Sequence, residues 1–86
     1  MNIKWKWYAP RNANKITVRM KDFTEYDIFT GLTKDKKLGY LRIFRYNPKG
    51  YKTTQVFYKI YDNLGEAMFY GHRMIKNLIS KGGKVT

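Results

Sequence analysis

The sequence predicts an α+β fold, in which an antiparallel β-sheet of three or four strands packs on one C-terminal α-helix. Apolar and polar residues alternate with a two-residue period in several segments between residues 16 and 61, as in half-buried strands. Between residues 64 and 81, apolar residues recur at three- and four-residue steps, as on one helix face. A chain of 86 residues predicts a single domain, 1–86, with its core between one sheet and one helix.

The first segment, residues 1–14, is interpreted as a basic aromatic arm or an edge strand. Trp5 and Trp7 alternate with lysines, and residues 9–14 favour a turn because they contain a proline and two asparagines. The two tryptophans either cover one end of the core or lie with their basic neighbours on a phosphate backbone. The arm contacts of the second interpretation would be Lys4, Trp5, Lys6 and Arg11.

The middle of the chain contains the strand candidates, which are enriched in β-branched and aromatic residues. They are residues 16–21, 26–32, 39–46 and 53–61. The connection after residue 32 is charged and ends in glycine, and the turn at residues 47–50 has proline early and glycine late. Consecutive candidates joined by such short connections favour antiparallel pairing.

The two faces of strand 39–46 differ in chemistry. Leu41 and Ile43 share one face, which we expect to be the core side, with Arg45 at its frayed end. The opposite face carries Tyr40, Arg42, Phe44 and Tyr46. In the alternative, Phe44 points into the core and the two faces are exchanged.

Strand 53–61 alternates in the same way. Gln55, Phe57 and Lys59 form one face, and Val56, Tyr58 and Ile60 form the other. We expect Gln55 and Phe57 to lie beside Arg42, on the side opposite the helix.

The helix prediction rests on a start signal, an apolar stripe and a stop signal. Asn63 followed by Glu66 resembles a capping box, and Gly82 and Gly83 end the pattern. The last three residues are expected to fray, and His72 to be a surface or boundary residue. The stripe consists of Leu64, Ala67, Met68, Gly71, Met74, Ile75, Leu78 and Ile79.

Positive charge is the strongest compositional signal. Eighteen lysines and arginines against six acids give a net charge of +12. Residues 1–21 and 36–61 contain no acid, whereas Asp22, Glu25 and Asp27 lie between these blocks. Because so large an excess repels itself in a small domain, it indicates a polyanionic partner bound at one positive face.

Several function classes are disfavoured. The chain has no cysteine and one histidine, so disulfides are excluded and a structural zinc site is not expected. A metal site at Asp22, Glu25 and Asp27 is also not favoured, since such carboxylates more often cap turns or pair with lysines. We expect no enzymatic activity and no cofactor. Without an apolar run long enough for a membrane span or a secretory signal, we expect a soluble, cytoplasmic protein.

One stretch carries a family resemblance. Gly31-Leu32 opens it, a basic hairpin follows at residues 34–37, and Tyr40 begins the next strand. After Tyr61 a helix is entered through a polar residue, an acid and an alanine, which are Asn63, Glu66 and Ala67. Residues 31–79 therefore resemble the APETALA-type domain of plant ethylene-response factors and, more closely, the arm-binding domains of phage tyrosine integrases.

The resemblance implies DNA bound in the major groove by the sheet face, with the helix packed behind. Two features depart from the family pattern: Tyr40 stands where the family has tryptophan, and the strand arginines are Arg42 and Arg45, so that one of them is out of step with the family's alternating arginines. Residues 1–25 have no counterpart.

We therefore expect a DNA-binding accessory or regulatory protein of a phage or other mobile element, with duplex DNA as the favoured partner. Base edges would be reached from Arg42 or Arg45 and from Gln55. The side chains of Arg42 and Lys49 are expected to be solvated in the free protein. The expected nucleic-acid contacts are Tyr40, Arg42, Arg45, Tyr46, Gln55, Phe57 and Lys59, flanked by Lys36, Lys37, Lys49 and Lys52.

Two alternatives remain open at the level of sequence. In the first, the aromatic residues of the two central strands stack on the bases of single-stranded DNA or RNA. In the second, a small phage inhibitor docks its basic face on a host protein or nucleoprotein complex, anchored by tyrosines.

Overall fold

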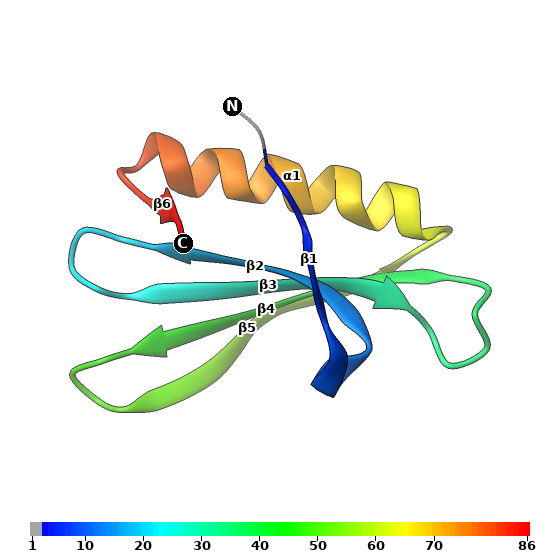
Figure 1. The fold of residues 1–86 in the computed structure, drawn as a ribbon, viewed down its shortest axis with the longest axis horizontal. Coiled ribbons are helices and arrows are strands. Elements are labelled where there is room, and N and C mark those ends of the chain that lie inside the picture. The colour runs from blue at the N-terminus through cyan, green and yellow to red at the C-terminus, as the bar shows by residue number, and fades with distance from the viewer. Residues whose placement is uncertain (1–2) are drawn as a thin grey trace.

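The computed structural model describes residues 3–86, in which a six-stranded antiparallel sheet packs on one helix (Figure 1). Met1 and Asn2, at the start of the expected arm 1–14, lie outside the described residues. The elements in order are β1 (Lys6–Tyr8), the 3-10 turn η1 (Ala9–Arg11), β2 (Ala13–Arg19), β3 (Glu25–Leu32), β4 (Gly39–Asn47), β5 (Lys52–Tyr61), α1 (Leu64–Ser80) and β6 (Lys84–Val85).

The predicted α+β class, with an antiparallel sheet and one C-terminal helix, is confirmed for residues 3–86, but the expected three or four strands are too few. Strands β1 to β5 are neighbours in sequence order, and β6 pairs with β2. The extra strands β1 and β6 both lie along the free edge of β2, opposite Ala13–Lys15 and opposite Val18 and Arg19 respectively. Together they cover an edge that would otherwise expose unpaired backbone groups.

The expectation that the last three residues fray is wrong. Gly82 has a φ of 101° and reverses the chain after α1, so that β6 returns to the sheet. The backbone N–H of Thr86 then donates to the carbonyl of Thr17 over 3.0 Å. A strand of two residues is too short to leave a periodic signal in the sequence.

The helix begins where the cap predicts. The backbone N–H of Glu66 donates to Asn63 Oδ1 over 2.8 Å, which satisfies one of the unpaired donors of the first turn. At the other end, the N–H groups of Gly82 and Gly83 donate to the carbonyls of Ile79 and Leu78. Helix α1 therefore ends at Ser80, one residue before the expected end.

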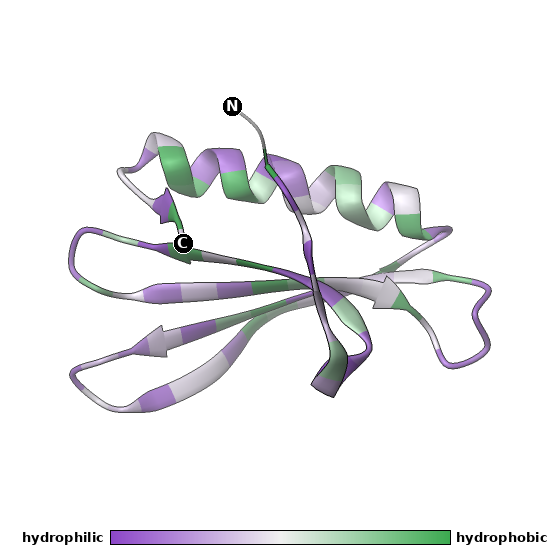
Figure 2. Ribbon diagram, in the orientation of Figure 1, coloured by the Kyte–Doolittle hydropathy of each residue, from purple (hydrophilic) through white to green (hydrophobic). Residues whose placement is uncertain are grey.

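The helix covers one side of the sheet, which we call the inner face; the opposite side is the outer face. Hydrophobic residues of α1 and of the strands meet between the two layers (Figure 2). Leu41 and Ile43 are buried there, as expected, and Phe44 lies on the outer face against Phe29. The buried core cluster consists of Ile16, Val18, Ile28, Leu41, Ile43, Tyr61, Ala67 and Ile75.

A β-bulge in β5 overturns part of the predicted face assignment. Phe44 pairs with Gln55 and Ile43 pairs with Phe57, so Val56 is the extra residue between the two pairs. An inserted residue reverses the alternation on its strand. Gln55 is therefore on the outer face with Arg42, but Phe57 is on the inner face and packs against the core. The expectation that Phe57 shares the outer face with Arg42 is wrong.

The N-terminal segment packs on the helix before it enters the sheet. Trp5 Nε1 donates to His72 Nε2 over 2.7 Å, and the two rings lie nearly parallel. The same indole lies over Gly71, where an added Cβ would be 3.1 Å from the ring. Trp5 therefore covers the core, as in the first interpretation of the arm, whereas Trp7 is 62% exposed.

The packing at Gly71 leads to a test of the helix–sheet interface. A leucine there would meet the Trp5 ring and a Leu41 methyl group, 3.1 and 3.4 Å from the new Cβ. We expect Gly71→Leu to destabilise the protein by about 1–3 kcal/mol, because overpacking forces the layers apart. Chemical denaturation measures this free energy of unfolding. Gly50→Leu, in the β4–β5 turn where an added Cβ meets no atom within 4 Å, is the control, and equal stability of both variants would contradict the assignment.

Candidate nucleic-acid interface

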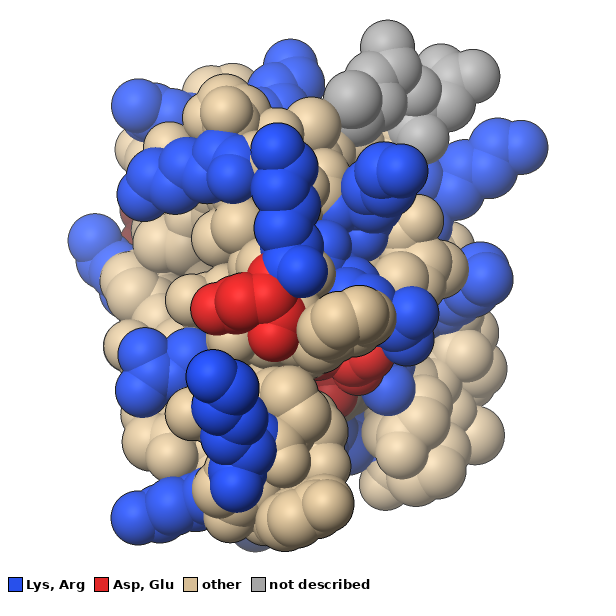
Figure 3. All heavy atoms as spheres, turned by 90° about the vertical axis from the view of Figure 1, so that its left-hand side faces the viewer, with Lys and Arg blue, Asp and Glu red and all other residues tan. Residues whose placement is uncertain are grey.

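Almost all of the positive charge lacks an acidic partner. Among residues 3–86, which contain all eighteen lysines and arginines, the only ion pair joins Arg19 to Glu25, over 2.8 Å. Figure 3 shows one end of the molecule, where lysine and arginine side chains surround a few acidic ones. No helix in the same described part of the chain is long and apolar enough to cross a membrane.

On the outer face, cations lie over aromatic rings. The guanidinium of Arg11 is 4.6 Å from the centre of the Phe44 ring and 5.1 Å from that of Phe29. The ammonium of Lys15 is 4.5 Å from the Tyr8 ring. Cations gain electrostatic stabilisation from the negative faces of such rings. Arg11 is therefore part of the folded outer face, which differs from its expected place on an extended arm.

Arg42 is at the centre of the acid-free part of this face. It lies opposite Tyr58 on β5, and its guanidinium carbon is 4.7 Å from the Tyr58 ring and 5.7 Å from the Tyr40 ring. Its Nε atom is buried and has no acceptor among the described residues. The expectation that Arg42 is solvated in the free protein is therefore wrong, because neighbouring tyrosines cover part of its side chain.

Gly31 holds Tyr40 flat against the sheet. A Cβ at this position would lie 2.8–2.9 Å from atoms of the Tyr40 ring, closer than real Cβ contacts allow. Only glycine therefore permits the ring to rest directly on β3. The Tyr40 ring is in turn 6.3 Å from the Tyr58 ring, and the two planes are inclined by 36°.

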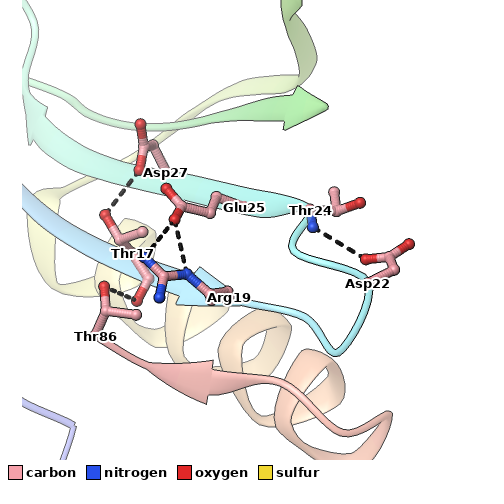
Figure 4. A network of polar contacts seen from close by, with 7 residues as sticks. All are labelled: Thr17, Arg19, Asp22, Thr24, Glu25, Asp27 and Thr86. Carbon is pink, nitrogen blue, oxygen red and sulfur yellow. Dashed lines mark hydrogen bonds and ion pairs between the residues drawn. The ribbon is translucent and has the colours of Figure 1, made fainter. Parts of the chain in front are cut away.

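The acids of the β2–β3 hairpin each have a separate partner (Figure 4). Asp27 accepts a hydrogen bond from the Thr17 hydroxyl over 2.7 Å, and Glu25 pairs with Arg19. Asp22 accepts from the backbone N–H of Thr24, a bond that lowers the pKa of its carboxyl group. These acids thus organise one hairpin, at the end of β3 remote from the β3–β4 connection.

The opposite end of the sheet presents lysines on an ordered hairpin. Between β3 and β4, Asp35 accepts hydrogen bonds from the Thr33 hydroxyl and from the N–H of Lys37. The Thr33 bond, followed by the Lys37 bond, lowers the pKa of Asp35, so its carboxylate is charged near neutral pH. The hairpin lysines Lys34, Lys36 and Lys37 are exposed.

A hollow of about 800 Å³ lies between this hairpin and η1. Four of the residues that line it are cationic: Arg11, Lys34, Lys36 and Arg42. Tyr40, Tyr58, Trp7 and two asparagines also line it, and none of the described lining residues is acidic. The hollow therefore combines positive charge, aromatic rings and hydrogen-bond donors.

The structure divides the expected binding residues between two faces. Tyr40, Arg42, Tyr46 and Gln55 are on the outer face. Arg45, Phe57 and Lys59 are on the inner face, where they pair with Tyr26, Ile43 and Leu41 respectively. For Lys59, as for Phe57, the bulge at Val56 reverses the expected side.

The four expected phosphate contacts lie at opposite ends of β4. Lys36 and Lys37 are in the β3–β4 hairpin, and Lys49 and Lys52 are at the β4–β5 turn. All four are exposed. Lys52, however, pairs with Asn47, which is on the same side of β4 as Arg45, so the expectation that all four flank the outer face is wrong for Lys52. On the arm, Lys4 and Lys6 are exposed as well.

Sequence reasoning missed Tyr58 and Phe29 as members of the outer face. Tyr58 was expected on the other side because the bulge leaves no trace in the alternation. Phe29 lies in a stretch, from Ile28 to Gly31, in which all four residues are buried. Such a stretch has no two-residue alternation that would assign Phe29 to one face of the sheet. The position of Arg11 over two rings depends on contacts distant in sequence, so no local pattern indicates it.

Comparisons with protein-family models, with curated proteins and with solved structures find no match for this chain. The residues of the outer face and of the hollow are therefore the basis for a functional conclusion.

Proposed function

We propose that this protein binds nucleic acid through the outer face of its sheet. The observation that carries the proposal is the combination of Arg42 and Gln55 on the outer face. The Nε–H of Arg42 has no acceptor among the described residues, and exposed lysines lie beyond both ends of β4. Apart from the Arg19–Glu25 pair, no cation among residues 3–86 is neutralised by an ion pair.

The lysines supply the part of the affinity that does not depend on sequence. Each phosphate that they neutralise releases condensed counterions. The logarithm of the binding constant therefore falls linearly with log[salt]. The pairs Lys36 and Lys37, and Lys49 and Lys52, are at the two ends of β4. A backbone on the outer face would reach Lys36 and Lys37 beyond one end of β4 and Lys49 beyond the other.

Arg42 and Gln55 supply groups that recognise bases. Arginine donates two hydrogen bonds to guanine and glutamine pairs with adenine in the major groove of duplex DNA. Their positions on adjacent strands of the outer face support duplex DNA as a partner. Phe57 and Arg45, on the inner face, have no part in this contact.

One observation favours single-stranded nucleic acid as a second candidate. Tyr58, opposite Arg42, is 44% exposed, and the Tyr40 ring is next to it. Bases of a single strand stack on exposed aromatic rings, whereas bases in a duplex are already stacked on each other. Binding measured on matched duplex and single-stranded oligonucleotides separates the two candidates.

The first test removes the central arginine. Arg42→Ala should weaken binding to a preferred sequence by about 1–3 kcal/mol and reduce discrimination between sequences, because the base contact is lost. Fluorescence anisotropy at fixed salt measures the affinity, and thermal melts verify folding. Arg73→Ala, on the exposed side of α1, is the matched control and should bind like the wild type. If Arg42→Ala binds duplex, single strands and RNA unchanged, the proposal fails.

The second test removes one phosphate contact. Lys49→Ala should weaken binding to all sequences equally and decrease the slope of log K against log[salt] by about one unit. The melting temperature should not change, since Lys49 is exposed. Affinities over a series of salt concentrations give the slope, with Lys76→Ala on the helix as control. A protein from nuclease-treated lysate that binds to the same face, with oligonucleotides unbound, would instead support the docking inhibitor.

A further inference from the structure

The hollow beside Arg42 has the size and lining of a binding site. Its volume of about 800 Å³ is within the range of roughly 300–1,000 Å³ typical of small-molecule sites. η1 and the β3–β4 hairpin contribute Arg11, Lys34 and Lys36 to its lining, whereas Tyr40 and Tyr58 come from β4 and β5. Cationic groups around aromatic rings match a ligand that has both a negative charge and a flat unsaturated ring.

The state of Arg42 indicates where such a ligand would bind. The guanidinium covers the Tyr58 ring at 4.7 Å, and its Nε–H, buried there, has no acceptor in the described protein. A buried donor without an acceptor raises the free energy of the conformation that contains it. A movement of the guanidinium onto an anionic oxygen would satisfy its donors, and it would also uncover the Tyr58 ring.

We propose that the hollow binds one unstacked nucleotide of a single strand, with its base on the Tyr58 ring in place of the Arg42 guanidinium. In this single-strand complex, in contrast to the base contact proposed for duplex DNA, the guanidinium turns onto the adjacent phosphate, an acceptor that matches its fork of N–H groups. This inference rests on the proposed nucleic-acid function and names the ligand at one part of that interface. Tyr40, held on Gly31, forms a second ring surface next to the base.

Charge and ring chemistry together select a nucleotide over an acidic peptide. The carboxylates of an acidic peptide would pair with the four cations of the hollow. Such a peptide has no flat ring, however, to stack on the Tyr58 ring once the Arg42 guanidinium has moved. A nucleotide has both an anionic phosphate and a flat base, and the two are only a few bonds apart. Asn12 and Asn14, which also line the hollow, provide amide donors and acceptors for the edge of a base.

The test compares two oligomers that differ only in their bases. Fluorescence anisotropy is measured with a labelled oligothymidylate and with an abasic sugar–phosphate oligomer of the same length. We expect the wild-type protein to bind both, and the oligothymidylate at least about fivefold more tightly, because a base stacked on an aromatic ring contributes that much.

Variants assign the preference to the hollow. Tyr58→Ala should reduce the ratio of the two affinities to about one and leave the abasic oligomer bound as before. Tyr58→Phe, which keeps the ring, should retain the preference, and so should Tyr51→Ala, which removes an exposed tyrosine at the far end of β4. In the wild type, the ¹⁵Nε resonance of Arg42 should shift more with oligothymidylate than with the abasic oligomer.

The outcomes separate this inference from the proposed function. If both oligomers bind with equal affinity, or if Tyr58→Ala weakens both equally, the nucleotide site is refuted while nucleic-acid binding stands. If neither oligomer, no duplex and no RNA binds, the proposed function fails as well. Displacement of the oligothymidylate by polyglutamate at equal charge concentration would also refute the site, since it would show recognition of charge alone. If Tyr58→Ala does not fold, the larger shift of the Arg42 ¹⁵Nε resonance with oligothymidylate assigns the base to the hollow, and equal shifts with the two oligomers refute the site.

Discussion

Positive charge without acidic partners determines how the outer face of the sheet is built. With six acids against eighteen basic residues, most cations have no carboxylate within reach, and their mutual repulsion disfavours the folded state. Several cations lie on the hairpins, and others lie over aromatic rings. Arg11, Lys15 and Arg42 all use rings on the outer face in this way.

This arrangement makes the outer face a second packed layer. Phe29 is only 3% exposed although it is on the side away from the helix, because Arg11 and the neighbouring rings cover it. If a ligand group replaces a lysine or arginine side chain over one of these rings, the change is local. The helix–sheet core on the other side of the sheet stays intact. The proposed binding face and the stabilising core are on opposite sides of one sheet.

The bulge in β5 determines which side chains can act together. Without the extra residue at Val56, Phe57 would lie opposite the helix and Tyr58 beneath it. With it, Phe57 packs on the core and Tyr58 lies opposite Arg42. A single inserted residue thus creates the pairing of arginine and tyrosine from which the hollow is formed.

Local periodicity was sufficient to predict much of the fold. The α+β class, the start of α1 with its Asn63 cap and the burial of Leu41 and Ile43 all follow from patterns within one element, where neighbours in sequence are neighbours in space. The inner position of Arg45 was predicted in the same way.

The remaining features depend on contacts between distant residues. The short strand β6 exists because Gly82 turns it back to β2, and the bulge depends on how β5 pairs with β4. The covering of Arg42 by tyrosines also involves a cross-strand contact. These features changed the composition of the candidate site, since Tyr58 and Ile60 occupy the side expected for Phe57 and Lys59.

The most direct test of nucleic-acid binding at the outer face is a map of the surface that an oligonucleotide contacts. Amide chemical shifts of the ¹⁵N-labelled protein, recorded during titration with a short single-stranded oligonucleotide, report which backbone groups change. We expect the largest changes in β4, β5, η1 and the β3–β4 hairpin, with small changes on the exposed side of α1. Changes centred on α1, with β4 and β5 unaffected, would contradict it.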